Sequence, residues 1–97
     1  MKSLAEIKQS LLQEKPLLQK KYRVQQLGIF GSYARGTEYS DSDLDLLIDY
    51  DEAPSLVTLI ALEQHFSTML GMSVDVVTRK GIKPQLRDTI LEEVIDL

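Results

Sequence analysis

The sequence contains no cysteine and no tryptophan, and it has only three prolines and five glycines among 97 residues. Without cysteine the chain forms no disulfide, binds no metal through thiolates and has no cysteine nucleophile. This composition fits a cytoplasmic protein, which is the location we expect. No apolar run approaches the ~20 residues of a transmembrane helix, and the amino terminus has no apolar signal-peptide block. We therefore expect no membrane association.

Basic residues are also few. The chain has 11 lysines and arginines against 15 acidic residues, which gives a net charge of −4. Proteins that bind a nucleic-acid backbone usually carry a basic stripe. The basic cluster of this chain is interpreted as a solvated helix end and consists of Lys15, Lys20, Lys21 and Arg23. Direct nucleic-acid binding is therefore not expected.

The remaining composition is that of one ordinary globular domain. Hydrophobic residues make up 43% and charged residues 27% of the chain, and 97 residues are enough for a single core. We expect one domain over residues 1–97, of which 1–22 form an N-terminal helical segment. In chain order we predict a helix over 3–15 with further turns over 17–22, strands over 24–30 and 44–50, a helix over 55–70, a strand over 73–78, a helix over 84–93, and over 94–97 either an edge strand or a continuation of the last helix.

Local signals set the expected boundaries. Ser3 and Glu6 form a capping box, Pro16 is expected to end or kink the first helix, and Gly71 stands where a helix C′ glycine belongs. The apolar stripes predicted to face the core are Leu4, Ile7, Leu11 and Leu12 in the first helix, and Leu56, Leu59, Ile60, Phe66, Met69 and Leu70 in the second. The near-continuous apolar run over 44–50 predicts a central strand. The order predicts an α/β (α+β) fold with a small mixed β-sheet flanked by helices.

One motif stands out from this background. Gly31 and Ser32 follow the first strand, and after ten further residues Asp43 and Asp45 open the second. Two carboxylates two residues apart on a strand share a face, and carboxylates are ligands for divalent cations. A Gly-Ser turn lets a phosphate approach the backbone closely. Four fixed residues at one spacing occur by chance in about one chain in a thousand of this length, so the pattern indicates a metal–nucleotide site.

This stretch resembles the signature of the nucleotidyltransferase superfamily with the polymerase β-like fold. The short chain is similar to its minimal nucleotidyltransferases, the MntA-like antitoxins of HEPN/MNT toxin–antitoxin pairs, from about Val24 to Leu97. The resemblance implies the polymerase β-like topology, ATP as nucleotide donor, and two Mg²⁺ ions held by Asp43 and Asp45, with Asp45 bridging them.

A third carboxylate is expected from a neighbouring strand, and Asp75 is the candidate. It stands among valines at 74, 76 and 77, where an unpaired buried charge would be unfavourable. From the residues alone, Asp75 is either a functional acid or a half-exposed strand acid paired with a base such as Arg79. The resemblance favours the first interpretation and implies that Asp75 completes the metal site and helps to deprotonate the attacking hydroxyl.

The residues around Gly31 are candidates for phosphate binding. The resemblance implies that Ser32 and the amides following Gly31 hold the β- and γ-phosphates. Arg35 matches the arginine of the Gly-Ser-x-Ala-Arg-Gly form of the motif. It either contacts phosphate or folds back onto the acidic strand to order the loop, since a guanidinium pairs with both groups.

Other polar residues are given structural roles. Asp41 is interpreted as an acid that stabilises its loop, and Asp49 as a strand-end surface acid. His65 lies off the apolar stripe of its helix and is expected to be solvated. Arg79 and Lys80 are interpreted as a solvated turn rather than as triphosphate ligands.

The resemblance implies a function. We expect transfer of AMP from ATP to a hydroxyl, a tyrosine being implied, of a cognate HEPN-type ribonuclease toxin, which would neutralise that toxin. One alternative is an antitoxin that masks the toxin by contact, with a vestigial nucleotide site; another is transfer to a small molecule. The complete set of Ser32, Asp43, Asp45 and Asp75 favours catalysis over the vestigial site. The chain leaves little surface for selecting an acceptor, so a partner protein is expected to supply it.

Overall fold

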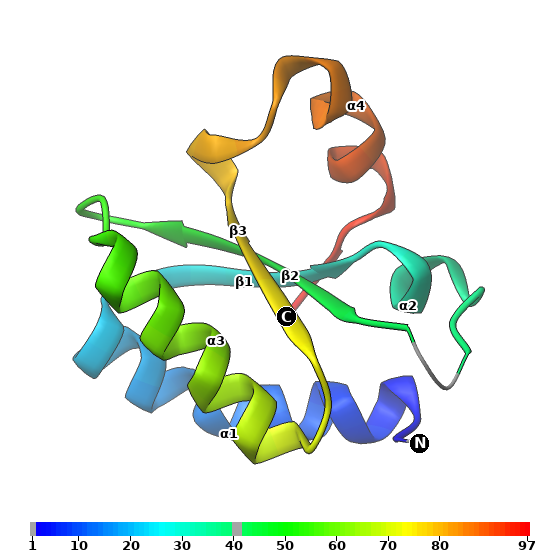
Figure 1. Cartoon of the computed structure of the whole chain (residues 1–97), viewed down its shortest axis with the longest axis horizontal. Coiled ribbons are helices and arrows are strands. Elements are labelled where there is room, and N and C mark those ends of the chain that lie inside the picture. The colour runs from blue at the N-terminus through cyan, green and yellow to red at the C-terminus, as the bar shows by residue number, and fades with distance from the viewer. Residues whose placement is uncertain (1, 40–41) are drawn as a thin grey trace.

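The fold was obtained as a computed structural model, which describes residues 2–39 and 42–97 (Figure 1). Its elements in chain order are α1 (Leu4–Tyr22), β1 (Val24–Phe30), α2 (Ser32–Arg35), β2 (Leu44–Tyr50), α3 (Leu56–Leu70), β3 (Val74–Thr78), the 3₁₀ turn η1 (Arg79–Gly81), α4 (Pro84–Glu93) and β4 (Ile95–Asp96). Within these ranges no helix is both long and apolar enough to cross a membrane.

The four strands form one mixed sheet in the order β3-β2-β1-β4. β1 pairs antiparallel with β2 and with β4, whereas β2 pairs parallel with β3. The predicted α/β fold with a small mixed sheet is therefore confirmed. The last four residues include an edge strand rather than an extension of the final helix, because Ile95 and Asp96 pair with β1.

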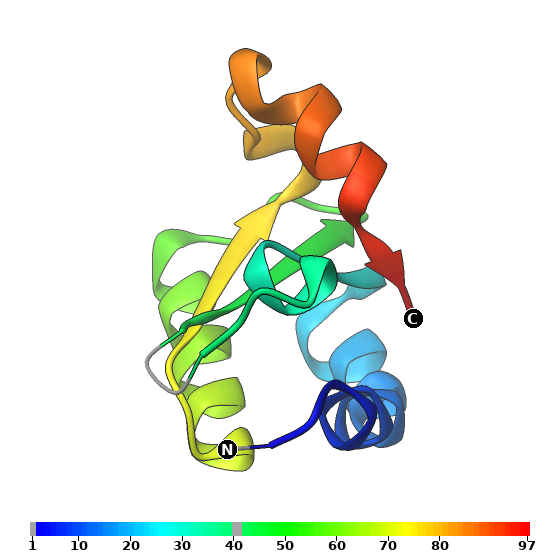
Figure 2. The ribbon, with the colours of Figure 1, turned by 90° about the vertical axis from the view of Figure 1, so that its right-hand side faces the viewer.

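Helices cover the two faces of the sheet unequally. The views in Figures 1 and 2 place α1 and α3 together on one face and α4 on the opposite face. Alternate residues of β2 follow this division. Leu44, Leu46 and Ile48 belong to the main core with α1 and α3, whereas Leu47 packs in a smaller cluster with Ile82 and Ile90 of the α4 side. Asp45 has the parity of Leu47, so it lies on the less covered face.

The predicted helix caps are present. Ser3 and Glu6 form the capping box of α1. The Ser55 hydroxyl accepts the Thr58 amide at the start of α3, and Gly71 ends that helix with a φ of 66°. These contacts depend only on neighbouring residues, which is why the sequence indicates them correctly.

The sequence predicts that Pro16 ends or kinks the first helix. The helix does not end near Lys15, because α1 continues through Pro16 to Tyr22, within the helical segment expected over 1–22. A proline within a helix removes one backbone hydrogen bond and is normally costly. Buried side chains on both sides of it, Leu11 and Leu18, belong to the same core cluster. Their burial holds the two halves of the helix on one side of the sheet and offsets the lost bond.

The buried face of α3 also differs from the predicted stripe. Leu62, Phe66 and Leu70 are buried, whereas Leu56 and Ile60 are 72% and 46% exposed. In α1, the predicted stripe member Leu12 is likewise exposed. Both helices have more apolar residues than one face can bury, so contact with the sheet decides which of them are covered.

His65 is not the solvated histidine expected from its position. Its side chain is 29% exposed, and its Nε2 lies 3.7 Å from Oε2 of Glu14 on α1. The imidazole also stands near the rings of Tyr22 and Phe66. His65 thus lies in the contact between α1 and α3, a packing that its own helix does not reveal.

Candidate active site

The turn at the end of β1 is built around Gly31. Its φ of 76° falls in a region that favours glycine, and a Cβ at this position would collide with the carboxylate of Asp45 on β2. The short helix α2 begins directly afterwards at Ser32. The glycine of the motif is therefore needed for two reasons, the backbone conformation and the close approach of Asp45.

One acid of the motif lies beside the acid expected from the neighbouring strand. Asp45 is paired in register with Asp75 across the parallel β2–β3 ladder, so both side chains project from the same face of the sheet. Asp43 directly precedes β2. These acids share an open hollow of about 440 Å³, here called the acidic hollow, which is lined by Ser32, Arg35, Thr37, Tyr39, Ser42, Asp43, Asp45 and Asp75. The fold thus brings together the predicted residues Ser32, Arg35, Asp43, Asp45 and Asp75, and Gly31 directly precedes Ser32.

The electrostatics of Asp45 reflect this crowding. Burial is the largest cause that raises the pKa of Asp45, followed by the charges of Asp75 and Asp43, and the pKa reaches about 6. Arg35 acts in the opposite direction and Glu93 adds a smaller increase. Negative charge is therefore concentrated here beyond what the single guanidinium neutralises, an environment that favours a bound cation.

Among the described residues, no three histidine, cysteine or acidic side chains form a ready-made metal-binding group. Proteins often hold Mg²⁺ through one or two carboxylates, while phosphate oxygens and water complete the shell. The Asp45–Asp75 pair, the neighbouring Asp43 and the open acidic hollow fit such a shared site.

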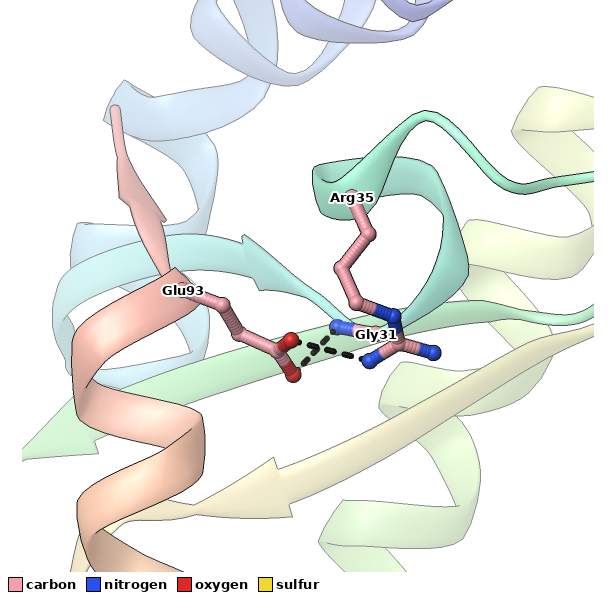
Figure 3. A network of polar contacts seen from close by, with 3 residues as sticks. All are labelled: Gly31, Arg35 and Glu93. Carbon is pink, nitrogen blue, oxygen red and sulfur yellow. Dashed lines mark hydrogen bonds and ion pairs between the residues drawn. The ribbon is translucent and has the colours of Figure 1, made fainter.

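Arg35 pairs with an acid that the sequence did not indicate. Its Nη1 donates to Oε2 of Glu93 at 2.8 Å, and the Gly31 amide donates to Oε1 of the same carboxylate at 3.1 Å (Figure 3). Arg35 thus contacts the end of α4 rather than the acidic strand, while still lining the acidic hollow. No local signal marks Glu93, because 62 residues separate it from Gly31.

The remaining sequence interpretations can be placed in the fold. Within the described ranges no ion pair joins Asp75 to Arg79, and Asp75 is exposed on the edge strand. Asp49 accepts the amide of Tyr50 near the end of β2, and Lys80 lies over the Tyr50 ring. The acid at position 41 lies outside the described residues.

Known proteins share both the sequence and the fold. A family model described as a nucleotidyltransferase domain matches residues 5–97. The chain is 46% identical over 96 residues to a Methanocaldococcus jannaschii protein named as a candidate protein adenylyltransferase, covering 98% of each chain. It is 40% identical over 95 residues to the protein adenylyltransferase MntA of Thermococcus cleftensis, covering 98% of this chain and 96% of that one.

A solved structure agrees with these relatives. The structure of a candidate minimal nucleotidyltransferase superposes with a TM-score of 0.75 at 34% identity, covering 96% of this chain and 90% of that chain. The resemblance drawn from the Gly-Ser and Asp-x-Asp motif is thereby confirmed. The chain belongs to the nucleotidyltransferase domain family of enzymes, as one of its minimal members.

Proposed function

We propose that this enzyme moves AMP from ATP onto a hydroxyl of a HEPN-type ribonuclease toxin, a tyrosine being the acceptor, and so neutralises the toxin. The observation that carries the proposal is the pairing of Asp45 with Asp75 beside the Gly31–Ser32 turn in one open hollow. That arrangement provides carboxylates for cations and a turn for phosphates within a single site.

The proposed reaction balances as a single displacement. The acceptor oxygen attacks the α-phosphorus of ATP and forms a new O–P bond, while the bond from the α-phosphorus to the bridging oxygen breaks and pyrophosphate leaves. Ser32 and the amides after Gly31 hold the β- and γ-phosphates. Arg35 lines the same hollow and has N–H donors that Glu93 does not engage. Asp75, which is exposed on the edge strand β3, accepts the proton of the acceptor hydroxyl.

Asp43, Asp45 and Asp75 are the residues that would hold two Mg²⁺ ions. When bound, these ions supply positive charge against the negative charge that develops on the attacking and leaving oxygens. The carboxylates themselves contribute a preorganised acidic face, and the close contact of Asp45 with Gly31 sets the distance between that face and the phosphate turn.

Relatives and neighbours support the proposed acceptor. The Thermococcus cleftensis relative is named a protein adenylyltransferase. A chain from the solved complex of a tri-AMPylated Shewanella oneidensis HEPN toxin with an MNT antitoxin superposes on this fold with a TM-score of 0.63 at 18% identity. On this chain, apolar side chains that are 72%, 77% and 46% exposed gather at the start of α3, namely Leu56, Val57 and Ile60. An exposed apolar patch of this kind is suited to a protein partner.

The decisive experiment measures the intact mass of the toxin partner after incubation with this protein, Mg²⁺ and each nucleoside triphosphate in turn. We expect mass increments of whole AMP units with ATP and none with the Asp43→Asn variant. Tandem mass spectrometry of the modified peptide then identifies the residue that carries AMP. An unmodified partner in every reaction would contradict the proposal.

A masking antitoxin is the alternative that the exposed patch on α3 also fits. Asp43→Asn separates the two, because it alters the acidic hollow and leaves Leu56, Val57 and Ile60 in place. Co-purification and a toxicity rescue assay are run on the same variant. A variant that binds the toxin without protecting cells supports enzymatic neutralisation, and one that binds and protects fully supports masking.

A further inference from the structure

One carboxylate, that of Glu93, holds both ends of the segment that begins the nucleotide motif. Its two oxygens accept separately from the Gly31 amide, just before α2, and from the Arg35 guanidinium, at the last residue of α2. Figure 3 shows this contact, with the Glu93 carboxylate at the end of α4 directed toward Gly31 and Arg35. Gly31 and Arg35 are therefore fixed relative to each other by a residue outside the motif.

The position of Glu93 is itself fixed from both sides. It is the last residue of α4, whose Ile90 packs with Phe30 at the end of β1. Two residues after Glu93, Ile95 pairs with Ile29 of the same strand. The Glu93 side chain is 15% exposed, against 51% for Arg35. Two anchors on β1 thus hold a largely buried carboxylate beside the turn, and its placement is rigid compared with that of the guanidinium.

The guanidinium retains donors for a ligand. Arginine carries five N–H donors, and Glu93 engages Nη1. In Figure 3 the second terminal nitrogen of Arg35 points away from the carboxylate. Because Arg35 also lines the acidic hollow, a phosphate there can bind the free side of the guanidinium while Glu93 keeps the other.

We propose that Glu93 is a positioning residue for the nucleotide, which orders Arg35 in advance so that its free donors face the triphosphate. The inference rests on the proposed use of ATP at this hollow. An unpaired arginine side chain loses considerable rotamer entropy when it binds a phosphate. Glu93 removes that loss beforehand, and its own charge is offset by the guanidinium that it holds.

The first experiment compares binding of the ATP analogue AMP-PNP, with Mg²⁺, by calorimetric titration. Glu93→Gln keeps the size and the acceptor for the Gly31 amide but loses the charge that attracts Arg35, so Kd is expected to rise about fivefold. Glu92→Gln removes the same charge from the adjacent, exposed position of the same helix and is expected to leave Kd unchanged. An unchanged or tighter Kd in Glu93→Gln would overturn the proposal, since a tighter Kd means that Glu93 competes with phosphate.

The second experiment asks whether Glu93 acts through Arg35. In an Arg35→Ala background, Glu93→Gln is expected to have no further effect on the Kd for AMP-PNP, because the group that it positions is gone. Additive effects of the two substitutions would show that Glu93 acts independently, and would overturn the proposal. Melting curves accompany each variant; a residue with a purely structural role would lower the melting temperature and leave Kd as in the wild type.

The two proposals fail in different ways. If the wild-type protein does not bind AMP-PNP with Mg²⁺, the proposed function is wrong. If it binds and Glu93→Gln behaves as Glu92→Gln does, only the role of Glu93 is wrong. Should Glu93→Gln not fold, Glu93→Asp serves in its place, because it keeps the charge and withdraws it from Nη1, and the same weakening of Kd is expected.

Discussion

Asp45 and Asp75 are direct partners in the parallel pairing of β2 with β3. Two carboxylates at adjacent positions on one face repel each other, and this repulsion is part of the reason that the pKa of Asp45 rises to about 6. A fold gains nothing in stability from such a pair without a cation. A bound cation, as proposed for the acidic hollow, would offset this repulsion.

The first prediction concerns stability and pH in the absence of divalent cations. The raised pKa of Asp45 means that the folded protein binds the proton of this carboxyl more tightly than the unfolded chain does. The free energy of unfolding therefore falls as the pH rises from 3.8 to about 6. Asp45→Asn should lack this loss. At pH 7 we expect it to exceed the wild type in stability by about 1 kcal/mol, a value reduced because the carboxyl is only half-buried.

Thermal melts across pH test this prediction. Asp49→Asn is the matched control, because Asp49 lies on the same strand outside the acidic hollow, and its pH profile should follow that of the wild type. If Asp45→Asn is less stable than the wild type at pH 7 without metal, the carboxylate stabilises the fold and the repulsion argument is wrong.

The second prediction concerns metal removal. We expect calorimetric titration to show ATP binding in the presence of Mg²⁺ and a large loss of affinity in EDTA, because the acids of the hollow repel a triphosphate unless cations intervene. Asp43→Asn should abolish transfer while keeping the melting temperature within a few degrees of the wild type. Full transfer activity in this variant would remove Asp43 from the proposed metal site.

The third prediction separates binding from chemistry at Asp75. In Asp75→Ala the Gly31–Ser32 turn and the Asp43–Asp45 pair remain, so the Kd for ATP should change by no more than about threefold. Loss of the group that accepts the acceptor proton should lower turnover about 100-fold. Single-turnover transfer to the toxin partner measures the second quantity. Wild-type turnover would make Asp75 an ordinary exposed acid of an edge strand.

The fourth prediction concerns Gly31. Gly31→Ala places a Cβ against the Asp45 carboxylate at a φ of 76°, and we expect a loss of about 3 kcal/mol in unfolding free energy together with loss of ATP binding. Gly71→Ala is the control for a positive φ alone, since nothing lies within 4 Å of the added Cβ and its left-handed backbone (φ 66°, ψ 33°) strains an alanine less than the φ 76°, ψ −153° of Gly31 does. That variant should lose about 1 kcal/mol and keep its ATP affinity. Equal losses in both variants would show that the contact with Asp45 is unimportant.

Much of the fold follows from the sequence because its signals are local. The Ser3 and Ser55 caps, the Gly71 terminus and the bounds of β1 and β2 depend on residues within a few positions of each other. The same holds for recognising the motif of Gly31, Ser32, Asp43 and Asp45, in which Asp43 directly precedes β2 and Asp45 lies on it.

Only the tertiary structure decided the features that depend on distant contacts. Burial of Leu11 and Leu18 against the sheet carries α1 through Pro16, although proline by itself favours a break. Packing also selects Leu62 over Leu56 for the buried face of α3. In each case several local choices are close in free energy, and contacts with the sheet determine which one is adopted.

The contact of Arg35 with Glu93 is also a feature that only the tertiary structure decided. The sequence alone determined that an arginine follows the phosphate turn and that its charge suits either a phosphate or a carboxylate. The choice of Glu93 depends on β4 pairing with β1, which brings the end of α4 back beside Gly31. No residue near Arg35 carries that information, because the contact forms only when the last strand closes the edge of the sheet.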